Sequence, residues 1–525
     1  MFKLLIILLG LSEVHHVHSA KILVVFNAVS RSHHILGDAL AVGLAEKGHE
    51  VMMISPFKSS SNHPNYKEIV LDGDFSPDKI MKIMGNLFKT KEKSVINTMS
   101  TISEFGLSMA KGTLNHPKVV DLLNSNAHFD AVIVEVFLNE CLLGLAQHFN
   151  AVPIMMGTAG PMIWTDKMVG NPSNPAYVIN PFTSFGNPMN YWQRLGNTFF
   201  SVVGELFYWY NIRQQNVFYE SYFRPMFKKN MKEFPHLSTL ISNVSLVLLN
   251  SNVATSDSQA LVPNMVTVGG LHIKPTKLPD DLQKLLDESK NGAIYFSLGS
   301  NLKSAELPDD KRDAILKTFS KLKETVFWKW EDDELPNQPS NVVIRKWMPQ
   351  QSILNHKNVK VFITHGGLSS SIESIYFGVP LIGIPVFGDQ RMNVARAIKS
   401  GYGVQIDLDE INEETFTKVL LEVLKNPSYR SRSQYLSKIF RDEPLPPLEK
   451  AVNSIEYVLR HEGAHFLRSP AADMPLYQTW LLDVAVGFVV IVLLVIMILK
   501  LLLKLTCRLF KYVFKFNSSK IHKVD

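Results

Sequence analysis

Blocks of apolar residues separated by polar turns predict alternating strands and helices in the first half of the chain. A β-branched run over 20–26 precedes a polar turn, and residues 35–47 then place apolar side chains at helical spacing. Further short apolar runs occupy 51–54, 131–134 and 152–156. A strand, a helix and a second strand in this order favour parallel pairing, because parallel neighbours need a long crossover connection. The pattern therefore predicts a doubly wound α/β domain.

A second series of the same kind begins near residue 293. Its expected strands and helices are 293–298, 311–322, 325–329, 342–345, 361–364, 368–377 and 381–384. Residues 271–292 contain two prolines and a charged run, which is typical of an interdomain linker. We therefore expect an N-terminal Rossmann-like domain over 21–270 and a C-terminal one over 293–470, facing each other across a cleft. Ligands of such sheets bind at the carboxyl ends of the strands.

Both ends of the chain carry apolar segments that interact with membranes in other proteins. Residues 1–20 have a lysine, an apolar run and small residues at the end, which indicates a cleaved signal peptide; a buried strand or helix is the alternative. Residues 480–503 are long enough to be a transmembrane helix, and the alternative is a buried soluble helix that is apolar on every face. The tail over 504–525 is basic and is expected to stay cytoplasmic. This topology is single-pass type I, with a luminal body.

The charge of the chain is concentrated at its C-terminal end. The net charge is +6, yet the 499 residues before the basic end hold 47 basic and 47 acidic side chains. A nucleic-acid-binding protein would need a basic face on a folded domain, so this class is excluded. Cys141 and Cys507 would lie on opposite sides of the membrane, and no internal disulfide is expected. Asn243 begins a glycosylation sequon in the luminal body.

Aromatic side chains crowd residues 185–227, a stretch with predominantly helical character. Helices at a membrane interface collect such rings. Core packing or a hydrophobic substrate cavity explains them equally well. The sequence leaves all three alternatives open.

Residues 362–390 combine a buried strand, a His-Gly-Gly turn and a helical carboxylate. Glycines at 366 and 367 let the backbone approach a ligand closely, and the free N–H groups at the start of the following helix favour phosphate. His365 can donate a further hydrogen bond to that phosphate. Glu373 lies on the helix, where its carboxylate can accept hydrogen bonds from two ribose hydroxyls. A plain tight turn and a solvated helix charge are the alternatives for these residues.

Two neighbouring segments add contacts for a nucleotide sugar. Asp389 and Gln390 supply an acceptor beside an amide, which suits sugar hydroxyls. Trp347 and Gln350 supply an aromatic face and an amide, which suit a stacked base. Ser300 follows a buried strand and offers another phosphate contact.

In order and spacing, residues 347–390 resemble the signature of the membrane-bound animal UDP-glycosyltransferases. The match runs without a gap through residues 362–367, Ser370, Glu373, 380–382, 385–386 and 389–390. The resemblance implies the GT-B fold, with two Rossmann-like domains and one C-terminal transmembrane helix. It also implies the donor-binding residues, which are Ser300, Trp347, Gln350, His365, Gly367, Ser369, Glu373, Asp389 and Gln390. Ser369 stands where relatives often carry Asn.

The resemblance also assigns the catalytic pair to the first domain. Counting back from the Gly-His-Glu at 48–50 places the family's catalytic histidine at His33 rather than His34. A neutral imidazole there can take the proton of an acceptor hydroxyl. Glu135 stands where many relatives carry Asp, and it would orient the imidazole. Asn139 and Glu140 are the fallback candidates.

The expected activity is an inverting transfer of a hexose from a UDP-sugar to the hydroxyl of a small lipophilic acceptor, of the detoxification type. UDP-glucose is the expected donor and UDP-glucuronate the alternative. No metal and no other cofactor are expected, although Asp72-Gly73-Asp74 superficially resembles a metal-binding motif. The expected location is the endoplasmic reticulum membrane. The sequence does not decide whether the protein forms a homo-oligomer. Two alternative functions also remain: an inactive membrane receptor, and an enzyme that epimerises or hydrolyses nucleotide sugars.

Overall fold

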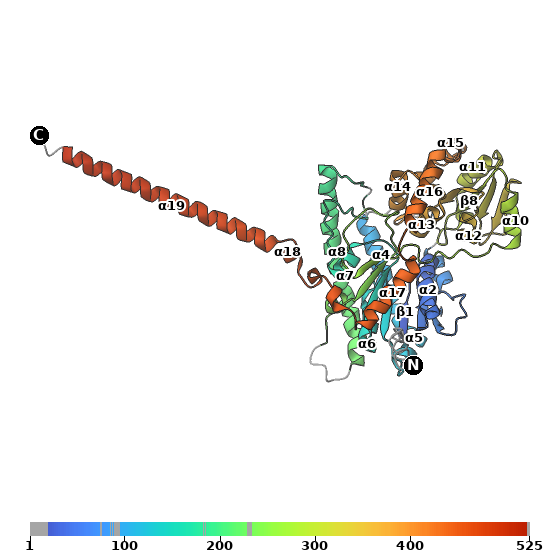
Figure 1. Cartoon of the computed structure of the whole chain (residues 1–525), viewed down its shortest axis with the longest axis horizontal. Helices are drawn as coiled ribbons and strands as arrows, with labels where there is room; N and C mark the ends of the chain where they lie inside the picture. Colours follow the sequence, from blue (N-terminus) through green and yellow to red (C-terminus); the bar gives the residue numbers. More distant parts are fainter. Residues whose placement is uncertain are drawn as a thin grey trace, which may run out of the picture. The chain divides into compact units, whose positions relative to one another are not determined.

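The computed structural model describes residues 19–73, 76–84, 86, 88, 95–181, 183, 185–227 and 234–521. By its contacts the chain divides into two units, Met1–Ser469 and Pro470–Asp525 (Figure 1). All but the last two residues of the expected signal peptide lie outside the described residues.

Seven parallel strands form the sheet of the first half, in the order β3-β2-β1-β4-β5-β6-β7. The strands are β1 (Lys21–Val25), β2 (Glu50–Ser55), β3 (Tyr66–Val70), β4 (Ala131–Val136), β5 (Val152–Gly157), β6 (Leu246–Leu249) and β7 (Met265–Thr267). Alternate residues of β1 and β4 enter separate hydrophobic clusters, because successive side chains of a strand point to opposite faces. Both faces of the sheet are therefore covered, as a doubly wound sheet requires.

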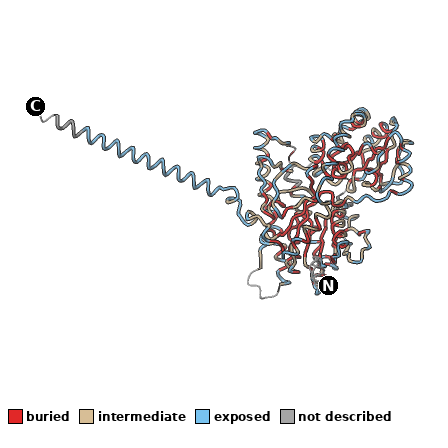
Figure 2. The backbone as a smooth tube through the Cα atoms, in the orientation of Figure 1, coloured by how far each residue is buried: buried red, intermediate tan, exposed pale blue. Residues whose placement is uncertain are grey.

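Six parallel strands form the second sheet, in the order β10-β9-β8-β11-β12-β13. They are β8 (Ala293–Ser297), β9 (Thr325–Lys329), β10 (Val342–Arg345), β11 (Val359–Thr364), β12 (Leu381–Gly383) and β13 (Gly403–Gln405). Phe296 and Trp328 stack at 4.7 Å between ring centroids in its core. Figure 2 shows buried segments concentrated in both sheets. The prediction of two parallel α/β sheets is confirmed.

Helices connect the strands on both faces of each sheet. Those of the first half are α2 (Arg31–Glu46), α3 (Pro77–Met84), α4 (Val95–Asn115), α5 (Pro117–Leu123), α6 (Gly144–Phe149), α7 (Ile163–Val169), α8 (Tyr191–Phe223) and α9 (Leu237–Ser242), with the short η3 (Glu140–Leu143). Those of the second half are α10 (Asp280–Glu288), α11 (Asp309–Ser320), α12 (Gln350–Leu354), α13 (Leu368–Phe377), α14 (Gln390–Lys399), α15 (Glu413–Lys425) and α16 (Pro427–Arg441).

Helix α17 (Pro447–Arg460) follows the second half in the chain but packs on the first sheet (Figure 1). Val452, Ile455 and Val458 are buried in the same cluster as residues of β1 and α2. A Cβ atom on Gly43 of α2 would lie 2.8 Å from Leu448 of α17, so the glycine permits this close approach. The expected C-terminal domain, 293–470, thus ends with a segment that completes the core of the first domain.

The second unit contains α18 (Leu476–Thr479) and the 40-residue helix α19 (Leu482–Ile521). Residues Leu482–Phe514 have a mean hydropathy of 3.2 in their most apolar window and are long enough to cross a bilayer. A candidate membrane helix stands where the sequence predicted one. The helix continues into the expected tail as far as Ile521, so the basic residues after 503 extend a helix rather than a loop.

Two truncations test the place of α17. A chain that ends at Ser469 keeps the whole first unit and is expected to stay folded. A chain that ends at Pro446 lacks α17 and exposes the cluster that it covers. Because each large buried side chain contributes about 1.5–3 kcal/mol, the loss approaches the whole stability of a domain. Thermal unfolding measures the stability of both chains; equal stability would contradict the packing of α17.

Candidate active site between the two sheets

His33 and Glu135 meet at the carboxyl edge of the first sheet. His33 lies in the first turn of α2, directly after β1, and Glu135 lies near the end of the neighbouring strand β4. Nδ1 of His33 is hydrogen-bonded to Oε1 of Glu135, and Oε2 accepts a hydrogen bond of 3.2 Å from the backbone N–H of Ala28. A carboxylate can only accept, so Nδ1 carries the proton and Nε2 is left as the basic nitrogen.

The surroundings of His33 set its proton affinity. Burial by itself lowers the pKa of His33. The charge and hydrogen bond of Glu135, together with the charge of Asp389, raise it by more, so the pKa of His33 lies above its ordinary value. The side chain keeps 22% of its exposure, and Phe137 contacts the imidazole edge-on with centroids 5.5 Å apart. Part of this rise in pKa comes from the second half, through the charge of Asp389.

The neighbouring candidates have other partners. Nδ1 of His34 lies 2.8 Å from Oγ of Ser55, and burial lowers the pKa of this histidine. Asn139 binds Asn27, and Glu140 accepts a 2.5 Å hydrogen bond from Gln215. Burial raises the pKa of Glu140 to about 7. Of these candidates, His33 is the one that the structure pairs with an acidic side chain in the cleft. His34, Asn139 and Glu140 have other partners.

The turn after β11 places His365 beside the start of α13. Gly366 has a φ of 79°, which glycine adopts without strain, and Gly367 is the N-cap of α13. The imidazole packs against Gly299 and Gly367, where an added Cβ atom would lie 2.5 Å from the ring. Burial and the charge of Lys329 lower the pKa of His365 to about 4. The ring is therefore neutral at physiological pH and can donate one hydrogen bond.

Ser300 and Ser369 flank this turn and are half-buried. Ser300 follows Gly299 after β8, and Ser369 lies in the first turn of α13. Because β8 and β11 are adjacent parallel strands, both loops leave the same edge of the sheet. The free N–H groups of the α13 terminus and these hydroxyls form a cradle suited to phosphate oxygens.

Glu373 is buried and already fully engaged with protein donors. Its carboxylate accepts hydrogen bonds from Nε2 of Gln350 at 2.6 Å, of Gln351 at 3.2 Å and of His272 at 3.0 Å. The sequence prediction missed Gln351 and His272. His272 lies two residues after the Gly269-Gly270 turn, at the start of the linker. A histidine at that position is the sequence feature that could have pointed to its role beside Glu373. A ribose at Glu373 would have to replace one of these donors.

Trp347 presents a ring that is 54% exposed, with cations near it from both halves. The guanidinium carbon of Arg31 lies 5.0 Å from the ring centroid, and the ammonium of Lys329 lies 5.9 Å away. Lys329 is buried and pairs with Glu331 at 2.6 Å. Arg31 and Lys329 are further cleft residues that the sequence prediction missed. Arg31 could have been predicted from its position, because it lies two residues before His33.

Asp389 and Gln390 lie where β12 leads into α14. Oε1 of Gln390 accepts hydrogen bonds from the backbone N–H groups of Val386 at 2.7 Å and Phe387 at 3.0 Å, which fix the loop. Oδ2 of Asp389 accepts a 2.9 Å bond from Asn393. The hollow that Asp389 shares with loops of the first half has about 40 Å³, whereas small-molecule sites usually need about 300–1,000 Å³.

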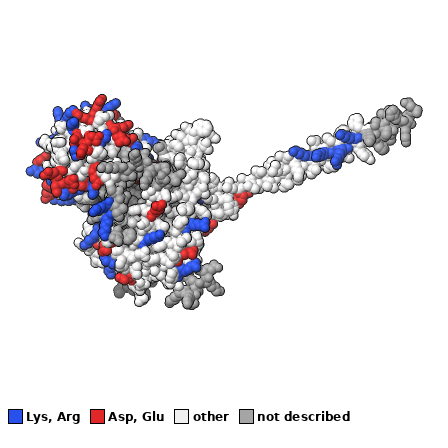
Figure 3. All heavy atoms as spheres, turned by 180° about the vertical axis from the view of Figure 1, so that it is seen from behind, with Lys and Arg blue, Asp and Glu red and all other residues white. Residues whose placement is uncertain are grey.

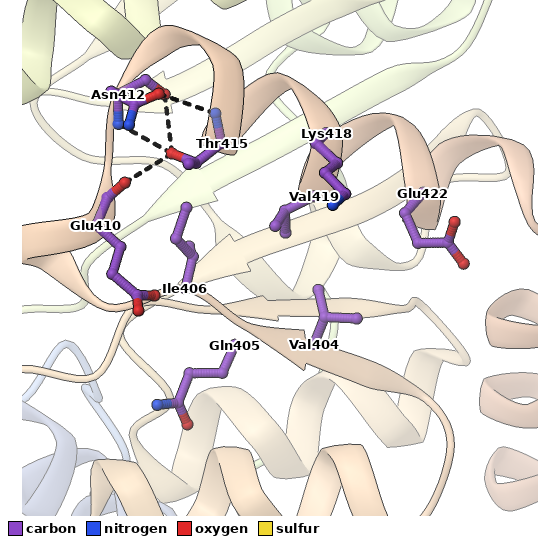
Figure 4. A pocket seen from close by; sticks show the side chains of 9 residues that line it. All are labelled: Val404, Gln405, Ile406, Glu410, Asn412, Thr415, Lys418, Val419 and Glu422. Atoms are coloured by element: carbon purple, nitrogen blue, oxygen red, sulfur yellow. Dashed lines mark hydrogen bonds between the residues drawn. The ribbon is translucent and has the colours of Figure 1, made fainter.

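A larger hollow, of about 690 Å³, lies outside this cleft (Figure 4). It runs between the edge strand β13 and helix α15, and none of the candidate residues lines it. Its lining mixes Lys418 and Glu422 with Val404 and Val419, and the figure shows the hydrogen bonds of Asn412 at one end. The chemistry of the site does not extend to this hollow.

Asp72 does not stand in a metal-binding cluster in the described part of the chain. It pairs with His116 and Lys118, each at 3.1 Å. Asp74 lies outside the described residues. Among residues that the structure describes, no group of three or more His, Cys, Asp or Glu side chains could hold a metal ion. Cys141 is buried and Cys507 exposed, and neither forms a disulfide. Asn243 is half-buried at the end of α9, where Oδ1 accepts a 3.3 Å bond from Arg468.

Two solved structures that are similar to this chain are glycosyltransferases. The glycotransferase of kitacinnamycin matches 84% of this chain and all of its own, with a TM-score of 0.56 and 16% identity. The glycosyltransferase VinC in complex with dTDP matches the same shares with a TM-score of 0.55 and 15% identity. At such identity the likeness shows the fold alone, which is the GT-B fold.

Sequence comparisons resolve the family. UDP-glycosyltransferase UGT5 of Dactylopius coccus is 35% identical over 90% of both chains, and UDP-glucosyltransferase 2 of the same insect is 34% identical over 92% of both. The human 2-hydroxyacylsphingosine 1-beta-galactosyltransferase is 29% identical over 89% of this chain and 85% of its own. The family model described as UDP-glucoronosyl and UDP-glucosyl transferase matches residues 20–520. Because this model covers nearly the whole chain and two relatives exceed 30% identity, the chain belongs to the UDP-glucuronosyl and UDP-glucosyl transferase family.

Proposed function

We propose that this UDP-glycosyltransferase moves glucose from UDP-glucose to the hydroxyl of a small lipophilic acceptor, with inversion at the anomeric carbon. The observation that carries the proposal is the hydrogen-bonded His33–Glu135 pair at the carboxyl edge of the first sheet. The name of a relative, UDP-glucosyltransferase 2, supports glucose as the sugar. Phe137 contacts His33 and Phe105 contacts Phe137, and these apolar rings beside the base support a lipophilic acceptor.

The catalytic step follows from the tautomer of His33. Glu135 holds the proton on Nδ1, so Nε2 takes the proton of the acceptor hydroxyl. The acceptor oxygen then attacks the anomeric carbon from the face opposite the diphosphate. The new carbon–oxygen bond forms as the bond from the anomeric carbon to the phosphate oxygen breaks, and UDP leaves with that electron pair. One displacement converts the α-linked donor into a β-linked product.

The second half stabilises the leaving diphosphate. The N–H groups at the start of α13, with Gly367 and Ser369, supply partial positive charge where negative charge develops. Neutral His365 donates a hydrogen bond, and Ser300 donates from the adjacent loop. These donors are already in place, so we propose that the step uses no metal ion.

The remaining contacts select and orient the donor. Trp347 stacks on uracil while Gln350 binds its edge, and Glu373 accepts the ribose hydroxyls after Gln350 or Gln351 moves aside. Asp389 and Gln390 bind sugar hydroxyls beside His33. The fixed loop of Gln390 keeps this end of the site rigid.

We further infer residence in the endoplasmic reticulum membrane with a luminal body and a glycan on Asn243. The candidate span is followed by basic side chains along α19, which stay on the cytoplasmic side in single-pass proteins. A glycan on Asn243 is compatible with the structure because the hydrogen bond to Arg468 uses Oδ1 and leaves the amide nitrogen for the sugar.

Replacing His33 tests the base. We expect His33→Ala to lower acceptor-dependent UDP release by about 10²–10⁴-fold, the usual contribution of a general base. His128→Ala is the matched control, because His128 is exposed and pairs only with nearby Asp130. The assay uses full-length chain in microsomes with UDP-glucose and a panel of phenols. Equal release by both variants would refute the mechanism. Release without acceptor would favour a hydrolase or epimerase, and no release by wild type would favour a receptor.

The pH dependence tests Glu135. The base is active when neutral, so activity rises with pH through the raised pKa of His33. Glu135→Gln removes the charge that raises this pKa, and the acidic limb of the kcat/KM profile should move to lower pH while the maximal rate falls. Asp389→Asn should move the limb in the same direction by less, since its contribution is the smaller one. An acidic limb that keeps its position in Glu135→Gln would show that this pair does not set the titration.

A further inference from the structure

Helix α8 has its polarity reversed relative to an ordinary surface helix. Every exposed position from 195 to 210 is apolar. These six residues, here called the α8 outer face, are Leu195, Phe199, Val202, Leu206, Trp209 and Tyr210, which are 41–64% exposed. Their spacing of three and four residues puts them on one stripe of the helix, and sixteen residues extend it over about 24 Å.

The inner side of α8 carries polar side chains as well as apolar ones, and several of the polar groups bind the body of the protein. Asn197 is fully buried and donates to the carbonyls of Pro175 and Val178 at 2.7 and 2.8 Å. Gln215 accepts from the N–H of Cys141 at 2.8 Å. The helix therefore buries part of its polar residues against the body, while the large apolar side chains of the α8 outer face stay exposed in the described structure.

The ends of the α8 outer face carry basic side chains. Arg194 and Arg213 are exposed at its two ends, and the guanidinium of Arg213 lies 5.9 Å from the centroid of the Trp209 ring. Glu205 borders the stripe but is paired with Lys167 at 3.1 Å. In Figure 3 the side of the body that bears α8 is mostly uncharged, while the lobe of the second sheet is crowded with both charges. Rings between arginines suit the boundary between lipid headgroups and acyl chains.

We propose that the α8 outer face lies on the surface of the lipid bilayer and forms a second membrane contact, in addition to α19. The chain itself argues for this occupant. Residues 470–481 are the only covalent connection from the first unit to α19, and such a segment spans at most about 40 Å. Once α19 is inserted, the first unit stays within that distance of the bilayer, and an exposed aromatic stripe there meets lipid at high local concentration.

Lipid quenching tests the contact in the full-length chain. Phe199→Cys is made in a Cys507→Ser background, labelled with bimane and reconstituted in phosphatidylcholine vesicles that contain nitroxide-labelled phosphatidylcholine. Cys141 is buried and stays unlabelled. The matched control is Lys317→Cys, an exposed position on α11. We expect quenching at 199 to exceed that at 317 by about threefold or more, as for a group inserted below the headgroups.

A second variant separates lipid from protein as the occupant. Leu206→Gln with Trp209→Gln changes only exposed side chains, so the thermal unfolding midpoint should hold while quenching at 199 falls to the level of the control. Equal quenching at 199 and 317 in the unaltered face would overturn the proposal. So would cross-linking of two chains through cysteines at 199 with no lipid quenching, since a second copy would then cover the face.

Discussion

The parallel pairing of β1 with β4 is the constraint on which the catalytic arrangement depends. In a parallel sheet all strands end at one edge, so a histidine after β1 and a carboxylate near the end of β4 are held together although 102 positions separate them. The carboxylate is fully buried, and its second oxygen is held by the N–H of Ala28. Glu135 therefore has one direction available, and the longer side chain, in place of Asp, still reaches Nδ1 of His33.

The second sheet repeats this principle with different chemistry. Its adjacent strands β8 and β11 bring Gly299 and His365 to one edge, and the glycines make room for a half-buried neutral imidazole. A neutral imidazole can donate a hydrogen bond to the phosphate, and it binds the UDP product less tightly than a charged one would, so UDP can leave. Polar contacts join the two halves in the cleft, such as the 3.2 Å hydrogen bond that Nδ2 of Asn301 donates to Oγ of Ser30. Helix α17, which follows the second half in the chain and packs on the first sheet, also connects the two halves.

Much of this arrangement follows from local sequence. The β-branched runs and the His-Gly-Gly turn specify strands and a tight turn by short-range rules, so both sheets could be predicted. The partners of Glu373 could not, because His272 and Gln351 reach it only through the packing of the linker on α12 and α13. The packing of α17 on the first sheet could not be predicted either, because its amphipathic pattern fits the core of either half. The exposed rings of α8 needed the structure, because composition cannot distinguish an inward from an outward face.

The stereochemistry of the product tests the central claim most directly, because a single displacement by a His33-activated acceptor has only one outcome. UDP-α-glucose and a simple phenol would be incubated with the full-length protein, and the anomeric proton of the product read by proton NMR. The account predicts the large coupling of a β-glucoside. A product with the small coupling of an α-glucoside would contradict it, since retention requires a covalent intermediate or attack from the diphosphate side.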